Sequence, residues 1–193
     1  GNVAGKVLAA GSFRDLDVKD VRFLHEASRF GRVRALLLSA DAEGRDEAHG
    51  PGFPLEERRY FVESIRYADS LMTTPPKGLE GIDLVLVRGT DEAAARTWGL
   101  LAACRNGSID YRILPEPELN GFPPHDLSLP SAVQGGKRVV VTGCFDWLHT
   151  GHVRFFEEVS GYGELYVVVG SDRNVELLKG KGLPIYHEEQ RRY

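Results

Sequence analysis

Two stretches of this chain resemble each other at a nearly constant separation. Both begin with an apolar run that reaches a glycine and a phenylalanine, and both continue into a segment with helical spacing. The matching pairs are KVLAAGSF at 6–13 with RVVVTGCF at 138–145, VRFLHE at 21–26 with VRFFEE at 153–158, Phe30-Gly31 with Tyr162-Gly163, and EERRY at 56–60 with EQRRY at 189–193. Because only two copies fit, the pattern indicates a duplicated domain and not a solenoid.

Each copy alternates strand-like and helix-like patterns. In the first copy, buried-type apolar runs at 33–39, 82–87 and 109–114 predict further strands. Helices are expected to begin near Pro54 and at Thr90, which carries an N-cap signature. Strands that alternate with helices predict an α/β fold, a Rossmann-like, doubly wound parallel sheet, present here as two tandem copies.

A stretch with five prolines and a Gly-Gly pair separates the two copies and has no packing period. We therefore expect a first domain at 1–115, a linker at 116–136 and a second domain at 137–193. Compared with the first copy, the second is about half a domain short, so we expect it to be incomplete. The first residue is not Met and the last ones read as the first turn of a helix, which suggests a fragment of a longer protein.

The composition narrows the class of protein. The formal net charge is −4 with interspersed charges, whereas nucleic-acid binders usually show a basic face. No apolar run approaches the roughly 20 residues that span a bilayer, and no signal peptide is recognisable. Cys104 and Cys144 lie far apart without metal-type spacing, so both are expected to be reduced and structural. These features favour a cytoplasmic protein that binds no nucleic acid and spans no membrane.

The stretch GCFDWLHTGH at 143–152 carries the chemistry of the second copy. A strand-like run precedes it and a helical pattern follows, so His149 and His152 lie at the entry to a helix. Phosphate groups bind well there, because free backbone N–H groups and the helix dipole point toward them. The two imidazoles, three positions apart, should share one face of the first turn. Gly151 leaves the surface between them open to close approach.

This stretch resembles the G-x-F-D-x-x-H-x-G-H signature of the cytidylyltransferase-like nucleotidyltransferases. The positions of the signature are filled by Gly143, Phe145, Asp146, His149, Gly151 and His152. The resemblance implies that the two histidines contact a nucleoside triphosphate and stabilise charge in the transition state. It also implies that an acceptor phosphate attacks the α-phosphorus in line, with pyrophosphate as the leaving group and no covalent intermediate. It covers 137–193 strongly and the first copy weakly.

The same resemblance supplies further candidate site residues. A lysine just before the E-x-R helix should reach the reacting phosphates, which leaves Lys179 and Lys181 as candidates, with Lys179 preferred. Arg191 of the E-x-R string would help to hold the triphosphate. The catalytic candidates are His149, His152, Lys179 and Lys181, and the nucleotide-binding candidates are Gly143, Cys144, Phe145, Asp146, Gly151, Asp172 and Arg191.

Simpler interpretations of some of these residues stay open. The two lysines could be solvated loop residues, and Arg191 could form a surface ion pair along its helix. Asp146 could organise the turn and not touch a ligand. No dedicated metal ligands are recognisable, so Mg²⁺ is expected only as the companion of the triphosphate.

The first copy departs from the signature at its chemical positions. Arg14 replaces the aspartate, Asp17 and Asp20 replace the two histidines, and Lys19 replaces the glycine between them. Two carboxylates would repel a triphosphate. We interpret this copy as a nucleotidyltransferase fold that has lost its chemistry, with a metal site at the two carboxylates as the alternative.

The resemblance implies a transferase that moves CMP from CTP to a small phosphorylated alcohol, such as glycerol 3-phosphate or phosphoethanolamine, in phospholipid precursor biosynthesis. The tandem arrangement resembles the eukaryotic phosphoethanolamine enzymes. The alternatives are an adenylyltransferase of the same superfamily that uses ATP and makes an ADP-sugar or a flavin or coenzyme product, or an inactive protein that binds nucleotide or acts as a scaffold. We expect a homodimer or an intramolecular pairing of the two copies.

Overall fold

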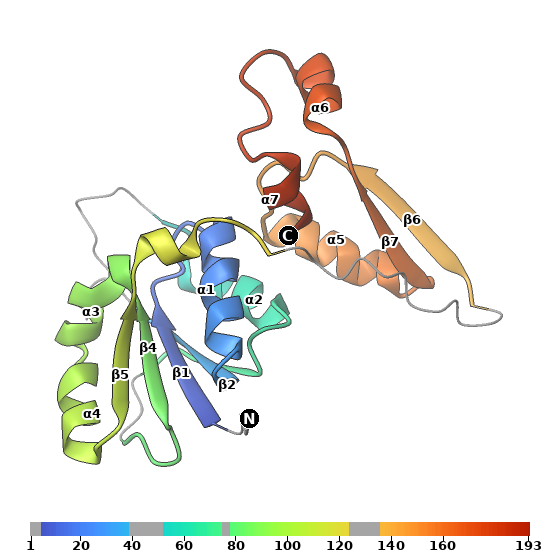
Figure 1. The fold of residues 1–193 in the computed structure, drawn as a ribbon. Helices are drawn as coiled ribbons and strands as arrows, with labels where there is room; N and C mark the ends of the chain where they lie inside the picture. Colours follow the sequence, from blue (N-terminus) through green and yellow to red (C-terminus); the bar gives the residue numbers. More distant parts are fainter. Residues whose placement is uncertain (1–4, 39–51, 75–77, 124–135) are drawn as a thin grey trace. The chain divides into compact units, whose positions relative to one another are not determined.

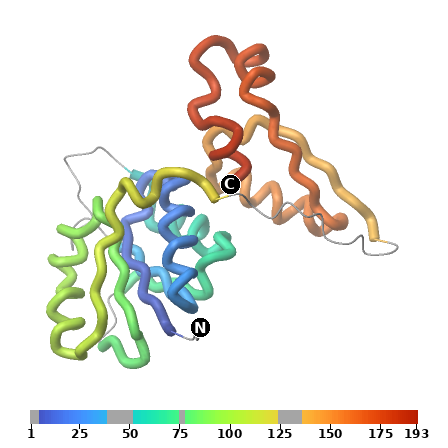
Figure 2. The backbone as a smooth tube through the Cα atoms, in the orientation of Figure 1, coloured from blue at the N-terminus to red at the C-terminus, as the bar shows by residue number. Residues whose placement is uncertain are grey.

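The computed structural model describes residues 5–38, 52–74, 78–123 and 136–193. Contacts divide the chain into two compact units, Gly1–Asn120 and Gly121–Tyr193. Figure 1 shows the elements of both units, and Figure 2 follows the backbone through them. Each unit is described by itself below.

The first unit is built on a five-stranded sheet in which every strand pair is parallel, in the order β3-β2-β1-β4-β5. The strands are β1 (Gly5–Gly11), β2 (Gly31–Leu37), β3 (Ser70–Met72), β4 (Leu84–Arg88) and β5 (Asp110–Leu114). From β1 the chain adds β2 and β3 on one side, then returns to add β4 and β5 on the other side of β1. This arrangement confirms the Rossmann-like parallel sheet, whose switch point lies between β1 and β4.

Helices cover the two faces of this sheet (Figure 1). They are α1 (Val18–Ser28), α2 (Leu55–Ser64), α3 (Glu92–Thr97) and α4 (Leu100–Gly107), with short 3₁₀ turns η1 (Gly89–Asp91) and η2 (Glu116–Leu119). Right-handed crossovers place α1 and α2 on one face and α3 and α4 on the other. One part of the core joins alternate residues of the central strands to α3 and α4: Leu8, Ala10, Leu36, Leu38, Val85, Val87, Ala95, Leu100 and Cys104.

Two expectations about the first unit need correction. The packed unit continues past residue 115, because η2 follows β5 and Leu119 is fully buried. The predicted linker therefore begins about five residues too early, and most of the remainder of 116–136 lies outside the described residues. The helix expected at Thr90 begins instead as the turn η1, and α3 follows without a side-chain cap. By contrast, α2 begins after Pro54 as expected.

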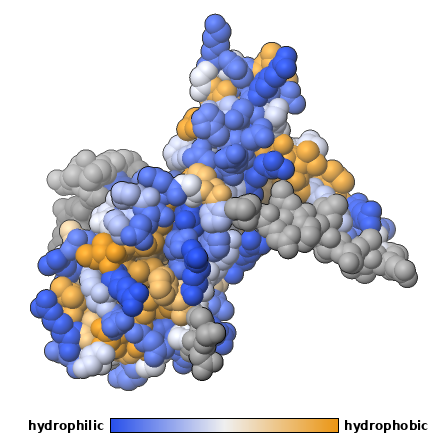
Figure 3. Space-filling model, viewed as in Figure 1, coloured by the Kyte–Doolittle hydropathy of each residue, from blue (hydrophilic) through white to orange (hydrophobic). Residues whose placement is uncertain are grey.

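The second unit contains one parallel strand pair among its described residues, β6 (Arg138–Gly143) with β7 (Glu164–Val169). Its helices are α5 (Thr150–Ser160), α6 (Asp172–Lys179) and α7 (Glu188–Arg192). The sheet of this unit is more open than that of the first, since Val140 is 62% exposed and Val168 is 50% exposed. Apolar surface is visible on both units in the space-filling view (Figure 3). No described helix is long and apolar enough to cross a membrane.

The β-α-β geometry of the two units agrees in detail. At the start of β2, a Cβ on Gly31 would lie 2.0 Å from the Gly5 carbonyl oxygen, so only glycine fits. Gly163 stands in the same relation to the Lys137 carbonyl oxygen, at 2.3 Å. Phe13 and Phe145, each two residues after the last residue of the first strand, share a positive φ of 48° and 47°. Sequence matches between the two stretches therefore correspond to matching backbone conformations.

Candidate functional site

The turn between β6 and α5 has an uncommon backbone conformation. The φ of Phe145 is 47°, in the left-handed region that residues other than glycine rarely adopt. Its ring folds back over Gly143, where an added Cβ would lie 2.6 Å from the ring. Phe145 is 9% exposed, and its ring meets that of His152 edge-on at 5.4 Å between centroids. Gly143 and Phe145 thus shape the turn and support the second histidine of the motif.

The two histidines cap the helix that they begin. His149 is the N-cap residue of α5, and its Nδ1 accepts a hydrogen bond from the Gly151 N–H at 3.1 Å. The Nδ1 of His152 accepts from the His149 N–H at 3.3 Å, and the two rings lie 4.0 Å apart. Serine, threonine, aspartate and asparagine usually perform this capping. Because both Nδ1 atoms act as acceptors, the hydrogen bonds assign the ring proton of each neutral imidazole to Nε2.

The surroundings of His152 favour its neutral form. Burial lowers the pKa of His152 below its usual value of 6.5, and the neighbouring His149 and Lys179 lower it further. A neutral imidazole keeps Nδ1 free to cap the helix and offers Nε2–H as a hydrogen-bond donor. His152 is therefore suited to donate to an anion without carrying a charge of its own at neutral pH.

Gly151 is required by the position of the first histidine. A Cβ at this residue would lie 2.9 Å from Cε1 and 3.0 Å from Nδ1 of His149. The side chain of any other residue would push the ring away from the backbone N–H that it accepts from. The motif predicts that this glycine allows close approach of a ligand, and in the structure the glycine also makes room for His149.

These residues line a pocket of about 470 Å³ at the carboxyl end of β6. The lining residues are Gly143, Cys144, Phe145, Asp146, Trp147, His149, His152 and Lys179. Lys179 ends α6 and brings an ammonium group to the pocket, whereas Lys181 is not among the lining residues. The geometry thus favours Lys179 over Lys181, in line with the preference drawn from the sequence.

Asp146 lines the pocket and also organises the loop that precedes α7. Its Oδ2 accepts from the Ile185 N–H at 3.0 Å, and its Oδ1 accepts from the Tyr186 N–H at 2.9 Å. The turn-organising role considered for this residue is therefore present in the structure. A contact between Asp146 and a nucleotide stays a prediction.

The environment of Arg191 differs from the surface ion pair that was one interpretation of this residue. Its side chain has no exposed surface, so the surface ion pair considered above is wrong. The guanidinium donates to the Cys144 carbonyl oxygen at 2.6 Å, to the Tyr186 carbonyl oxygen at 2.8 Å and to the Asp172 carboxylate at 2.8 Å. Arg191 is also not among the residues that line the pocket.

Asp172, another nucleotide-binding candidate, lies outside the pocket lining as well. Its second carboxylate oxygen lies 3.1 Å from Nδ1 of His187, and its backbone N–H donates to Glu188 at 3.3 Å. The hydrogen bond from Arg191 lowers the pKa of Asp172 below its usual range. The hydrogen bond with His187 lowers this pKa further, to a smaller extent. Asp172 therefore connects the beginning of α6 to α7.

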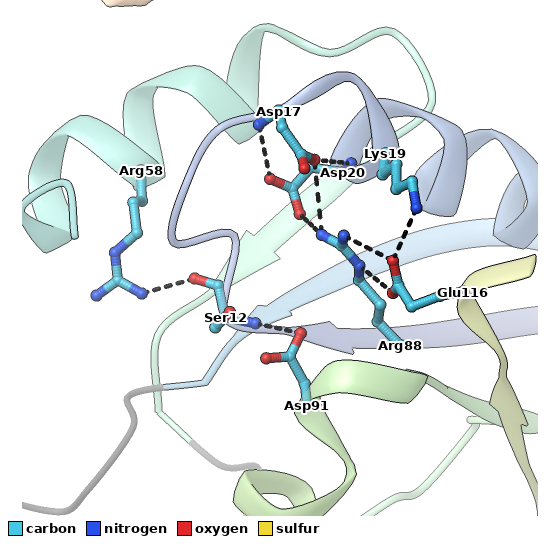
Figure 4. A network of polar contacts seen from close by, with 8 residues as sticks. All are labelled: Ser12, Asp17, Lys19, Asp20, Arg58, Arg88, Asp91 and Glu116. Carbon is cyan, nitrogen blue, oxygen red and sulfur yellow. Dashed lines mark hydrogen bonds and ion pairs between the residues drawn. The ribbon is translucent and has the colours of Figure 1, made fainter. Parts of the chain in front are cut away.

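In the first unit, carboxylates replace the histidines in the same capping arrangement. Asp17 is the N-cap residue of α1 and accepts from the Asp20 N–H at 2.9 Å, while Asp20 accepts from the Asp17 N–H at 3.0 Å. Arg88 donates to Asp20 at 2.6 Å and to Glu116 at 2.7 Å, and Lys19 lies 3.4 Å from Glu116 (Figure 4). Burial and the adjacent Asp17 raise the pKa of Asp20 to about 8.

This network was not predicted from the sequence, because its members are far apart along the chain. Asp20 is 1% exposed, and Arg88 provides its charge partner from the end of β4. Among the described residues, no group of three or more metal-ligating side chains comes together. A charged residue at the carboxyl end of the strand beside β1 was the one signal that could have indicated Arg88.

The comparison with protein families matches part of the second unit. The sequence model of the family described as Cytidylyltransferase-like matches residues 140–192. The bifunctional protein HldE of Koribacter versatilis is 49% identical over 57 residues, which are 28% of this chain and 12% of that protein. HldE of Aliarcobacter butzleri is 43% identical over 60 residues, which are 30% of this chain and 13% of that protein. HldE of Photobacterium profundum is 42% identical over 89 residues, which are 44% of this chain and 17% of that protein.

The chain thus spans less than a fifth of the length of these relatives. The range matched by the family model includes the whole motif from Gly143 to His152, the pocket lysine Lys179 and Arg191. This match and the geometry of the turn support the same conclusion. Over residues 140–192, the chain is similar to the cytidylyltransferase-like family.

Proposed function

We propose that the second unit carries the site of a nucleotidyltransferase that moves a nucleoside monophosphate from a triphosphate to a small phosphorylated alcohol. One observation carries this proposal: the His149–His152 pair at the start of α5 and Lys179 line the same pocket. CTP is the first candidate for the donor, on the resemblance of the motif and the tandem arrangement to the phosphoethanolamine enzymes. We further propose that the protein acts in the cytoplasm.

In this reaction, an oxygen of the acceptor phosphate forms a bond to the α-phosphorus while the bond to the β-phosphate oxygen breaks. Pyrophosphate leaves with the bonding electrons, so no oxidant, reductant or covalent enzyme intermediate is needed. The protein contributes positioning and charge stabilisation. The two Nε2–H groups would donate to phosphate oxygens, and Lys179 would balance the negative charge of the reacting phosphates.

Mg²⁺ would arrive with the triphosphate and supply additional charge neutralisation at its oxygens. Asp146 is the carboxylate among the pocket-lining residues, and each of its oxygens already accepts one backbone N–H. A carboxylate oxygen has a further lone pair, so Asp146 is compatible with a metal-bound ligand without being a dedicated site.

An adenylyltransferase that uses ATP is the second candidate. The features that carry the proposal, the histidine pair and the pocket lysine, bind phosphates and are indifferent to the base. The name of the relatives, bifunctional protein HldE, does not distinguish the two bases either. We propose the first unit as a structural partner, since its Asp17 and Asp20 are occupied by capping and by Arg88.

Calorimetric titration of the 193-residue chain with CTP·Mg and ATP·Mg tests the proposal. We expect tighter binding of CTP, and loss of binding in the His149→Ala/His152→Ala double variant. Tighter binding of ATP would assign the adenylyl alternative. Failure to bind either nucleotide would contradict the proposed site and favour the scaffold interpretation.

A further inference from the structure

Each unit has an arginine that occupies the same place relative to its strand-to-helix turn. Arg58 is the fourth residue of α2 and Arg191 is the fourth residue of α7. Arg58 donates through Nη1 to the Ser12 carbonyl oxygen at 2.6 Å, and Arg191 donates through Nη1 to the Cys144 carbonyl oxygen at 2.6 Å. Ser12 and Cys144 each immediately precede the phenylalanine that has a positive φ. The arginine therefore fixes the same peptide group in both units.

The first unit shows that this contact does not depend on the histidine motif. Asp17 and Asp20 occupy the positions of the two histidines, yet the bond from Arg58 to the turn is kept (Figure 4). An arginine whose only role was to bind a triphosphate would not need a hydrogen bond to the carbonyl group of the turn. The shared role of the two arginines is thus the conformation of the strand-to-helix turn.

The contact matters because the turn is strained. A phenylalanine with φ near 47° is stable only when its surroundings hold it there. In the second unit, Arg191 fixes the carbonyl group just before Phe145, and the Phe145 ring in turn meets His152 at 5.4 Å. A path of direct contacts therefore connects the buried guanidinium to a pocket imidazole.

A second path leads from Arg191 to the pocket lysine. Asp172 accepts from Arg191 at 2.8 Å and is the first residue of α6, whose last residue is Lys179. The position of the guanidinium thus affects the placement of α6 relative to the turn. With three acceptors already bound and no exposed side-chain surface, Arg191 has little capacity to bind a ligand directly.

We infer that Arg191 and Asp172 are positioning residues of the pocket, which set the histidine pair and Lys179 through the Cys144 carbonyl and α6, and do not act as ligands of the triphosphate. This inference rests on the proposed function for its catalytic meaning. Its structural content, the control of the histidine rings by a buried guanidinium, can be tested without any nucleotide.

The first experiment is NMR of the ligand-free chain. The chain has six histidines, so the ring signals of His149 and His152 can be assigned by single substitutions. We expect Arg191→Gln to shift both signals and to move the titration midpoint of His152. Arg192→Gln, on the same helix with an exposed side chain, serves as the matched control and should change neither.

The second experiment separates positioning from ligand contact. Asp172→Asn should shift the same ring signals in the wild-type background and have a smaller effect in the Arg191→Gln background, because the contact between Asp172 and Arg191 is already lost there. Binding of CMP and of CTP should weaken together, by about tenfold or more. Arg191→Lys, which keeps the charge but loses the forked donors, should behave like Arg191→Gln and provides a second variant if the glutamine protein does not fold.

Two results would overturn the inference. One is unchanged histidine signals in ligand-free Arg191→Gln together with a selective loss of CTP affinity over CMP affinity, which is the behaviour of a triphosphate ligand. The other is additivity of the Asp172→Asn and Arg191→Gln effects. If the wild-type chain binds no nucleotide, the proposed function fails while the ring signals still decide the positioning role.

Discussion

His152 accepts a hydrogen bond from the backbone N–H of His149 at 3.3 Å, so the second histidine of the motif caps the helix at whose N-cap the first one lies. The side chains therefore serve the fold through Nδ1 and present Nε2–H to the pocket. In each ring, Nδ1 accepts the capping hydrogen bond, which leaves Nε2–H for the proposed chemistry. Substitutions can separate the two roles.

Replacing His149 or His152 by Ala should reduce turnover by at least about 100-fold, the scale for loss of one transition-state stabiliser. His149→Asn keeps a good N-cap residue but removes Nε2–H, so it should fold normally and still lose turnover. Steady-state measurement of pyrophosphate release provides the readout. Asp17→Ala in the first unit is the control: it should lower the stability of that unit by about 1 kcal/mol and leave turnover nearly unchanged. An equal loss of turnover from Asp17→Ala would show that the first unit is catalytic.

The lowered pKa of His152 predicts a pH dependence with a definite sign. Below pH 6.5 the unfolded chain takes up a proton at this residue before the folded chain does, so the free energy of unfolding should decrease as the pH falls. NMR titration should give a midpoint below 6.5. Lys179→Ala should raise this midpoint because it removes a nearby positive charge, whereas Lys181→Ala should not. A midpoint at or above 6.5 would contradict the environment described for His152.

Gly151→Ala should test the position of the His149 ring. Alanine is a better helix former than glycine, so the start of α5 should not be weakened by its intrinsic propensity. The added Cβ would lie 2.9 Å from the His149 ring and should displace it, which we expect to reduce turnover by about tenfold or more. Gly161→Ala at the other end of α5, where φ is −64°, is the matched control and should retain activity. Full activity of Gly151→Ala would mean that the ring position observed here is unimportant.

Arg88→Met should destabilise the first unit by about 3 kcal/mol at pH 9.5, where the Asp20 carboxyl group is ionised, since it leaves this buried carboxylate without its charge partner. The loss should be smaller at pH 5. The raised pKa of Asp20 means that the folded chain protonates this group as the pH falls below about 8, and a neutral carboxyl group needs no charge partner. Urea unfolding at both pH values checks the result. Arg112→Met, which breaks an exposed ion pair with Asp110, should change the stability by less than about 0.5 kcal/mol. A loss independent of pH would contradict the role assigned to Asp20.

The expected pairing of the chain with a second copy, or of its two units with each other, can be tested at the exposed sheet of the second unit. Val140 and Val168 are 62% and 50% exposed on β6 and β7. If this apolar surface mediates pairing, Val140→Glu and Val168→Glu should reduce self-association in sedimentation experiments or increase proteolysis of the second unit. Leu55→Glu, at an exposed position of the first unit, is the control. Unchanged association and protease resistance in both valine variants would argue against pairing through this sheet.

Features that depend on neighbouring residues could be predicted from the sequence alone. Alternating strand and helix patterns were enough for the parallel sheet, because the period of apolar residues reflects local backbone geometry. The three-residue spacing of His149 and His152 was enough to place both rings at the start of one helix, since that spacing is determined by the helix itself. The matching stretches also indicated that Phe13 and Phe145 occupy equivalent turns.

Only the tertiary structure decided which side chains meet across long separations. Asp146 contacts the backbone of Tyr186, 40 residues away, and Arg191 contacts that of Cys144, 47 residues away. Arg88 reaches Asp20 across 68 residues. The sequence therefore suggested Arg191 as a ligand of the triphosphate, whereas packing surrounds it with protein acceptors. The pocket lining includes Lys179 and not Lys181, which agrees with the preference drawn from the sequence, but only the folded chain brings the end of α6 beside the histidine pair.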